Sequence, residues 1–544
     1  MSVSAPPPSV YRRRRTAAAV GLLGVAALVA LVVVLLTGGS GAGSSGGGGA
    51  PAAVVPADAL AYVDLDINRK DPAVTQALEV LQRLPDFAVL ATAASSRLGS
   101  VLGGQSLDFS TGVSPWLGGG AALALLNTTT STAGALIVVD VTDEARARSF
   151  LRSAGATARG SYRGHALLTA SNGDELAFAH GELLIGQDAA VREAIDVAAG
   201  ARPSLAASPT YRRATQGQGS GSVLDAYASA AGVRRVLADQ SGILGAIGGL
   251  LSQPALQAVA IALTPTQKGA AIRIHSALDP ALEKVGPNAS PPAAFTPTLP
   301  ALMPAASSLL LDVADLARVA PTVLDAGSAA GVAGGIGPLL TRLGSALRSE
   351  GVNVSDLTSI FRHEAAVAVV GGGQSPALVV VARTTDQAQT QHELAQLEAP
   401  LAQLFSTPGK NQSSEPVFND RQLGAVTAHQ LQLTTGFQLD YAVFHGLVVI
   451  STSLAGVQDV ADQTRSLAHD PGYDAVLGGA TSQTTSLVFA NVAALLSATQ
   501  QSGSSAGSLT ARLMPDLRAI TGVGLTSTRG AADSTTQVTV AVKR

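Results

Sequence analysis

The chain of 544 residues has no cysteine. Without thiols there is no disulfide, no thiolate nucleophile, no cysteine metal ligand and no lipidated N-terminal cysteine. Charge is also scarce: Asp, Glu, Lys and Arg make up 13% of the residues, and the formal net charge is -3 at pH 7. Because a nucleic-acid-binding surface needs clustered positive charge, we expect no nucleic acid partner.

Apolar residues are abundant instead, at 47% of the chain. The length is well above a typical domain of ~100–200 residues, so we expect two or more folded units with ample cores.

The N-terminal region has the features of a membrane anchor. An uncharged, apolar stretch runs from Thr16 to Leu36. A helix needs ~20 such residues to cross a ~30 Å hydrocarbon core, so we predict a transmembrane helix over 16–37 that contacts the lipid bilayer. The alternative is a cleaved signal peptide, whose apolar region is usually shorter, at ~7–15 residues.

Four arginines determine the expected orientation of this helix. They directly precede the apolar stretch and are Arg12, Arg13, Arg14 and Arg15. Because basic residues beside a membrane span stay on the cytoplasmic side, residues 1–15 form the predicted cytoplasmic tail and 38–544 are predicted to be extracytoplasmic, at the cell membrane. Residues 38–55 begin with a Gly/Ser-rich run that cannot pack, and we interpret them as a flexible linker.

The remainder of the chain contains an internal duplication. Six segments recur in the same order: "PADALAYVDL" (56–65) and "PAASSLLLDV" (304–313), "RLGSVL" and "RLGSAL", "ALIVVDVT" and "ALVVVART", "AFAHGELLIG" and "AVFHGLVVIS", "LAASPTY" and "LAHDPGY", and "PALQAVAIALT" and "PDLRAITGVGLT". Such ordered matches predict two related repeats, 56–285 and 304–544, joined by a Pro-rich connector, 286–303. Extra residues around 397–420 in the second copy are interpreted as a surface insertion.

Each copy has the pattern of short Val- and Ile-rich strands interrupted by amphipathic helices. This indicates an α+β fold with mainly antiparallel sheets. In "DPAVTQALEVLQRLP", Asp71 is suited to cap a helix that begins at Pro72, with Val74, Leu78 and Leu81 on its apolar face.

The pair Asp64 and Asp66, in "AYVDLDIN", is the one weak metal candidate. Residues two apart on a strand share a face, so both carboxylates could approach one cation. The second copy has Asp312 and Ala314 at the matching places, and no third ligand is evident. We therefore favour a strand that either shows one face to solvent or ends in a turn, where Asp caps the next segment.

Other polar residues are best explained by structure. His180 and His445 each precede a glycine between two apolar strands, which is typical of a hairpin turn. His392 and Glu393 lack the second histidine of a zinc-protease helix. Packing explains Arg97 and Arg342 of the "RLGS" segments, and the remaining expected core residues are Trp116, Tyr211 and Tyr473.

The segment "VPADALAYVDLDIN" (55–68), together with the predicted anchor and linker, resembles the bacterial domain-of-unknown-function family 3352. The resemblance covers roughly residue 55 to the end and implies membrane-tethered ectodomains. It supplies no activity and no functional residues.

These observations favour a non-enzymatic, single-pass envelope protein that binds another macromolecule or has a structural role, with no cofactor and no metal. A carrier of an apolar ligand or lipid is the alternative, because segments such as 331–347 could line a cavity. An anchored hydrolase is weaker, since no set of nucleophile, base and acid emerges.

Overall fold

The structure is a computed structural model, and it describes residues 51–85, 112–127, 134–237, 254–283, 293–316, 361–371, 376–404, 416–434, 437–463, 465–479, 482–501 and 517–543. The chain divides into two compact units, the first within 1–287 with 531–535 and the second within 288–530 with 536–543. The predicted tail, transmembrane helix and linker up to residue 50 lie outside the described residues. In the part of the chain that is described, no helix combines the length and hydropathy needed to cross a membrane.

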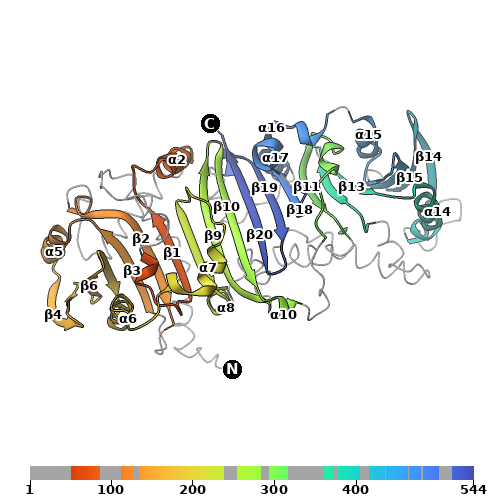
Figure 1. Ribbon diagram of the computed structural model, residues 1–544. Coiled ribbons are helices and arrows are strands. Elements are labelled where there is room, and N and C mark those ends of the chain that lie inside the picture. Colours follow the sequence, from red (N-terminus) through yellow and green to blue (C-terminus); the bar gives the residue numbers. More distant parts are fainter. Residues whose placement is uncertain are drawn as a thin grey trace, which may run out of the picture. The chain divides into compact units, whose positions relative to one another are not determined.

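The first unit contains an antiparallel sheet of ten described strands (Figure 1). In chain order they are β1 (Ala61–Asp66), β2 (Leu117–Leu126), β3 (Gly134–Val141), β4 (Thr157–Tyr162), β5 (His165–Thr169), β6 (Glu175–Ala179), β7 (Glu182–Gly186), β8 (Leu224–Ser229), β9 (Leu256–Thr266) and β10 (Gly269–Leu278). Neighbouring strands pair in the order β4-β5-β6-β7-β3-β2-β1-β8-β9-β10.

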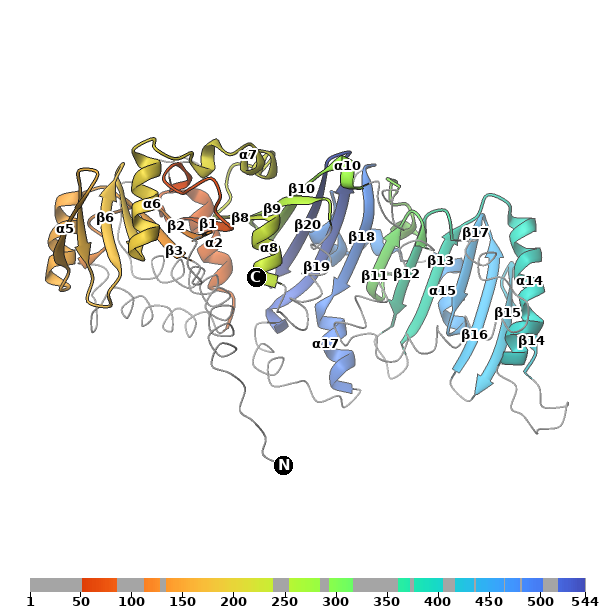
Figure 2. The ribbon, with the colours of Figure 1, turned by 90° about the horizontal axis from the view of Figure 1, so that it is seen from below.

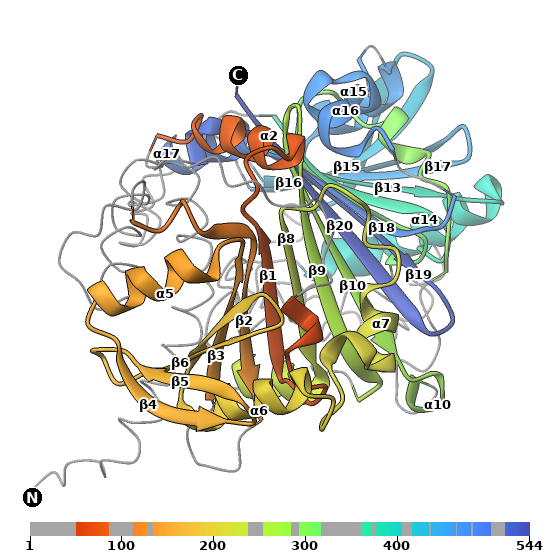
Figure 3. The same cartoon turned by 60° about the vertical axis from the view of Figure 1, so that its left-hand side comes forward.

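Helices cover both faces of this sheet (Figure 3). One face packs against α6 (Asp188–Ala198), α7 (Pro209–Thr215) and the 3-10 turns η1 (Pro51–Ala53) and η2 (Leu205–Ala207). The other face packs against α2 (Pro72–Leu81) and α5 (Glu144–Ser153). Two further helices, α8 (Ala230–Leu237) and α10 (Pro280–Glu283), complete the described helices of the unit.

The second unit repeats this architecture with ten described strands of its own (Figure 2). They are β11 (Ser307–Val313), β12 (Ala365–Val370), β13 (Ala377–Arg383), β14 (Phe418–Leu423), β15 (Val426–Thr434), β16 (Phe437–Phe444), β17 (Leu447–Ser451), β18 (Thr484–Asn491), β19 (Ile520–Arg529) and β20 (Asp533–Val542). Their order is β14-β15-β16-β17-β13-β12-β11-β18-β19-β20, which matches the first unit strand for strand.

The helices of the second unit are α14 (Gln387–Leu404), α15 (Leu454–Asp462), α16 (Pro471–Leu477) and α17 (Val492–Gln501), with 3-10 turns η3 (Leu299–Ala301) and η5 (Leu467–His469). The elements α15, α16, η3 and η5 contribute to the main core of this unit, while α14 packs on a smaller cluster. The predicted α+β class with antiparallel sheets is confirmed in both units.

Two of the duplicated sequence motifs meet in each unit. In the first, Pro56 forms a β-bridge with Ser204, so the start of "PADALAYVDL" lies against the residues that lead into "LAASPTY". In the second, Pro304 bridges Ser466 in the same way. The tyrosine of the second motif is buried in both cases, at Tyr211 and Tyr473. The repeated motifs therefore form the same contact twice.

Local capping explains where the predicted helices begin. The Asp71 carboxylate accepts the Ala73 N–H at 2.7 Å, and α2 starts at Pro72, as predicted. Its fully buried residues are Val74, Ala77 and Val80, while Leu78 packs partly on the core. The buried stripe is thus displaced from the predicted Leu78 and Leu81 by one position, because it follows an i, i+3, i+6 spacing.

The predicted linker, 38–55, overlaps the described residues only at 51–55. There the chain forms η1, and Ala52, Val54 and Val55 are buried in the first core. The Val55 carbonyl accepts the Leu205 N–H at 2.7 Å. These residues pack because their side chains are apolar, unlike the Gly/Ser run that precedes them in the sequence.

Candidate functional site

The weak metal candidates Asp64 and Asp66 lie on β1, an inner strand of the first sheet. Asp66 ends the strand, and its carboxylate accepts the Asn68 N–H at 2.8 Å, so the predicted turn role is confirmed for this residue. Asp64 differs from prediction: only 9% of it is exposed, because helices cover both faces of the sheet. A solvent-facing role for Asp64 is therefore wrong.

Asp64 belongs to a group of acids on one face of the sheet. On β8, Asp225 lies directly opposite it in the strand register. Burial, followed by the charge of Asp225, raises the pKa of Asp64 to about 6. Burial also raises the pKa of Asp225, although the Ser222 hydroxyl donates a 2.6 Å hydrogen bond to its carboxylate. Asp64 and Asp225 therefore favour neutral carboxyls more than ordinary surface acids do.

A second facing pair is formed by Asp140 on β3 and Glu182 on β7. Glu182 is 3% exposed, and burial, followed by the charges of Asp140 and Asp64, raises its pKa to about 8. Asp140 accepts the Gly119 N–H at 2.9 Å. Its carboxylate occupies the space beside Gly118, where an added Cβ would lie 2.1 Å from Oδ2. The glycine run of β2 thus makes room for Asp140.

The second unit places Asp312 where the first has Asp64: each aligns with an alanine of the next strand, Ala366 and Ala122 respectively. Asp312 has no exposed surface, and neither carboxylate oxygen accepts a hydrogen bond of normal geometry from the described residues. Burial, followed by the Glu364 carboxylate, raises the pKa of Asp312 to about 9. At neutral pH the Asp312 carboxyl is therefore protonated.

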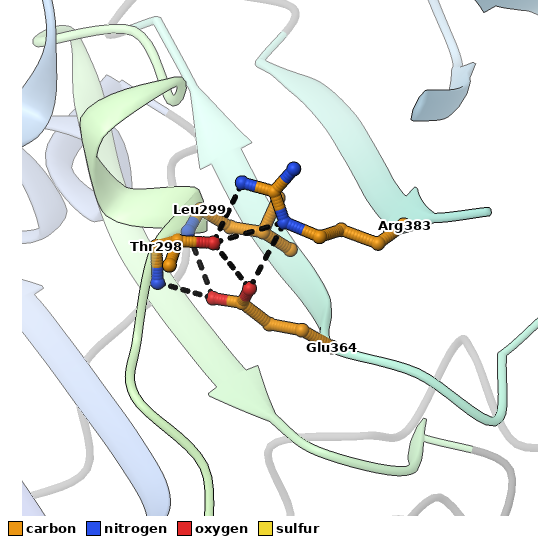
Figure 4. A network of polar contacts seen from close by, with 4 residues as sticks. All are labelled: Thr298, Leu299, Glu364 and Arg383. Carbon is orange, nitrogen blue, oxygen red and sulfur yellow. Dashed lines mark hydrogen bonds and ion pairs between the residues drawn. The ribbon is translucent and has the colours of Figure 1, made fainter. Parts of the chain in front are cut away.

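The Glu364 side chain, which lies beside Asp312, is fully engaged in hydrogen bonds (Figure 4). One of its oxygens accepts the Thr298 N–H and, at 2.8 Å, the Leu299 N–H. The other accepts the Thr298 hydroxyl and the Arg383 Nε at 3.2 Å. Arg383 Nη2 also donates to the Thr298 hydroxyl at 2.7 Å. The network fastens the end of the predicted connector to the second sheet and caps η3.

The two units differ in charge around their shared aspartate. By strand register, Arg383 and Leu447 of the second unit correspond to the acids Asp140 and Glu182 of the first. The carboxyl at the common position is kept, while its neighbours change from acids to an arginine and a leucine. The sequence comparison identified the shared aspartate but not these neighbours, because only the pairing of the strands places them near it.

The histidines of the "HG" pairs form hairpin turns, as predicted. His180 and Gly181 both have positive φ, at 55° and 81°, and they connect β6 to β7. His445 and Gly446 connect β16 to β17 with φ of 50° and 72°. In addition, the His180 ring lies 2.9 Å from the Ala198 carbonyl at the end of α6.

Trp116, Tyr211 and Tyr473 are buried, which confirms the prediction that they are core residues. Trp116 also donates to the Gly112 carbonyl at 2.7 Å. Arg97, Arg342 and the segment 331–347 lie outside the described residues, as do the topology determinants Arg12, Arg13, Arg14 and Arg15.

One polar cluster was missed by the sequence reasoning. In the second unit, His429 Nδ1 lies 3.0 Å from Asp420 Oδ1 and 3.3 Å from Glu398 Oε1, and the ring stacks on Tyr441. A signal for it existed, because Glu398 and Asp420 lie within the 397–420 insertion that distinguishes the second copy. Within the described ranges, no group of three or more His, Asp or Glu side chains has an arrangement that could hold a metal ion.

Residues 16–543 match the family described as "Protein of unknown function (DUF3352)". The chain belongs to the DUF3352 family. The match extends over both units and confirms the resemblance seen in the sequence, while it adds no activity. A comparison with curated proteins gives no match.

Among solved structures, this DUF3352 chain shows a distant likeness to TP0453. Crystal form III of TP0453 is 12% identical, with 43% of this chain and 82% of that chain covered and a TM-score of 0.25. Crystal form I is also 12% identical, with 42% and 79% covered and a TM-score of 0.26.

Proposed function

We propose that this DUF3352 protein is a single-pass, membrane-anchored envelope protein. Its two sheet units act outside the membrane as a binding or structural module without catalysis. The basic tail, the apolar stretch of membrane-spanning length and the Gly/Ser run support the topology. The family match begins at Thr16, the first residue of the predicted helix, so the apolar stretch is part of the family pattern.

The burial and hydrogen bonding of the acids support the proposal that the two units are not catalytic. The carboxyl common to both units, Asp64 or Asp312, is buried in the sheet. Glu364, the acid beside Asp312, has both oxygens occupied by N–H and O–H donors. A general base needs a carboxylate or imidazole within reach of a substrate proton. These acids are instead buried in the sheet or occupied by contacts within the fold, which is the behaviour expected of a binding or structural module.

The absence of cysteine gives a direct test of topology. Single-cysteine variants Ser4→Cys and Ser44→Cys would be treated in intact cells with a membrane-impermeant maleimide. We expect labelling of Ser44→Cys only, and of Ser4→Cys only after lysis. Replacing Arg12, Arg13, Arg14 and Arg15 by Glu in the Ser4→Cys background should reduce that asymmetry. Labelling of Ser4→Cys in intact cells with native arginines would contradict the proposed orientation.

Native mass spectrometry of the full-length chain in detergent tests the functional class. A stoichiometric protein partner would support the proposal. A stoichiometric bound lipid would instead support the apolar-ligand carrier, and a bound divalent ion at Asp64 and Asp66 would overturn our interpretation of those carboxylates.

A further inference from the structure

The insertion that distinguishes the second unit contributes two acids to one histidine. The described part of 397–420 comprises the end of α14, which carries Glu398, and the start of the edge strand β14, which carries Asp420. Both carboxylates approach the same ring nitrogen, Nδ1 of His429 on β15. The insertion is thus tied to the sheet at both of its described flanks.

The strand register fixes the position of the ring. His429 lies directly opposite Asp420 on β14 and directly opposite Tyr441 on β16. The imidazole stacks on the Tyr441 ring with centroids 4.6 Å apart and planes 15° apart. The Tyr441 hydroxyl donates a 2.5 Å hydrogen bond to Glu398, so the same carboxylate oxygen contacts both rings. Stacking and hydrogen bonding hold the imidazole in one orientation.

This arrangement determines which proton can move. Nδ1 faces two acceptors, so it carries a hydrogen in the neutral ring as well as in the cation. A second proton therefore binds at Nε2 and places a positive charge between two carboxylates. When it leaves, the ring is neutral and the repulsion between Glu398 and Asp420 is no longer compensated. Histidine is the side chain that makes this change between about pH 5 and 8.

Three elements in the described part of the unit contribute titratable side chains to the surroundings of the ring. The titratable groups that face it are Glu398 from α14, Asp420 from β14 and Tyr441 from β16. Tyr441 itself belongs to an apolar cluster with Leu394 and Val448, against which Leu397 and Phe418 also pack. Arg421, the next residue along β14, donates instead to Gln430 at 2.9 Å.

The first unit serves as an internal comparison. By register, Leu168 on β5 and Leu176 on β6 stand where the second unit has His429 and Tyr441. These two paired positions hold apolar side chains in the copy that lacks the insertion and titratable side chains in the copy that has it. The histidine, the tyrosine and the two acids therefore occur together as one device.

We propose that His429 is a proton-operated clamp, which holds the edge strand β14 and the end of α14 to the second sheet when its ring is charged and loosens them when its ring is neutral. The side chains of Asp420, Glu398 and His429 are 72%, 28% and 18% exposed, so solvent protons reach the cluster without unfolding the unit. The expected effect is that of a partly screened ion-pair network, a two- to fivefold change in opening of β14, since such pairs contribute about 0.2–1 kcal/mol.

Hydrogen–deuterium exchange of the full-length protein in detergent tests the clamp. The readout is the protection of amides in 418–423, corrected for the intrinsic pH dependence of exchange. In the wild type we expect protection to fall about two- to fivefold from about pH 5.5 to pH 8. In His429→Leu, which restores the residue of the first unit, we expect no such step. His392→Gln, at an exposed histidine of α14, is the matched control and should retain it.

A second variant keeps the test decisive if His429→Leu does not fold. Asp420→Asn removes one of the two charges at a well-exposed position and should reduce the step. The clamp would be overturned by pH-independent protection of β14 in the wild type, or by an undiminished step in either cluster variant.

Discussion

The buried carboxyl of Asp312 gives the sharpest prediction for stability. Its pKa is raised from 3.8 to about 9 in the folded protein, so between these values the folded state holds a proton that the unfolded state has released. Each pH unit above 3.8 therefore lowers the free energy of unfolding by about 1.4 kcal/mol. At pH 7 the accumulated cost is about 4 kcal/mol, and it is absent below about pH 4.

Asp312→Asn removes this cost, because an amide of the same shape needs no proton to stay neutral. The amide can donate to the neighbouring Glu364 carboxylate, but its remaining polar atoms lose hydration, which costs about 1–2 kcal/mol. We expect the variant to raise the free energy of unfolding by about 2–3 kcal/mol at pH 7. The gain should grow towards pH 8, vanish near pH 5 and become a loss of about 1–2 kcal/mol near pH 4.

The assay is thermal or urea unfolding of the full-length protein at pH 5, 6, 7 and 8, following the transition of the second unit. Asp462→Asn makes the same chemical change at an exposed carboxyl of that unit and should leave the pH dependence unchanged. If Asp312→Asn and the wild type lose stability in parallel as the pH rises, the carboxyl is not held protonated and the reasoning fails.

Two further substitutions probe close packing and turn geometry. Gly118→Ala would place a methyl group 2.1 Å from Asp140 Oδ2, and we expect a loss of about 1–3 kcal/mol in the free energy of unfolding. The control is Gly219→Ala, where the added Cβ meets nothing within 4 Å, and thermal unfolding of both variants measures the difference. Equal stability of the two variants would contradict the packing described for β2. His180 has φ of 55°, so His180→Val should lose about 1–2 kcal/mol, whereas His180→Asn should keep the turn because Asn tolerates this conformation. Chemical unfolding distinguishes them, and a valine variant as stable as the asparagine variant would show that the turn rearranges freely.

The sequence was sufficient to predict features that depend only on neighbouring residues, such as helix caps and turns. Asp71 caps α2 because its carboxylate reaches an N–H two residues on, and His180 with Gly181 turns because both adopt positive φ. The pattern of strands and helices also predicted the class of fold, and the ordered repeats predicted a duplication, with which the common strand order of the two units agrees. None of these inferences required knowledge of which strands are neighbours.

The acid groups depend on distant pairing and were therefore not predictable in the same way. Asp140 meets Glu182 across 41 intervening residues of sequence, through the pairing of β3 with β7. The burial of Asp64 was mispredicted because strand alternation indicates that residues share a face, but not whether helices cover that face. His429 was missed for the same reason, because its correspondence with Leu168 of the other copy emerges only from the strand register.

The burial of residues 51–55 sets a practical boundary for any shortened version of this protein. Ala52, Val54 and Val55 fill the first core, and burying the two valines contributes about 3–6 kcal/mol to its stability. A truncation that began at Pro56, where the recognisable repeat starts, would remove a piece of the interior and expose the sheet beneath it. Secretion or crystallisation trials should therefore retain the chain from Pro51 onward.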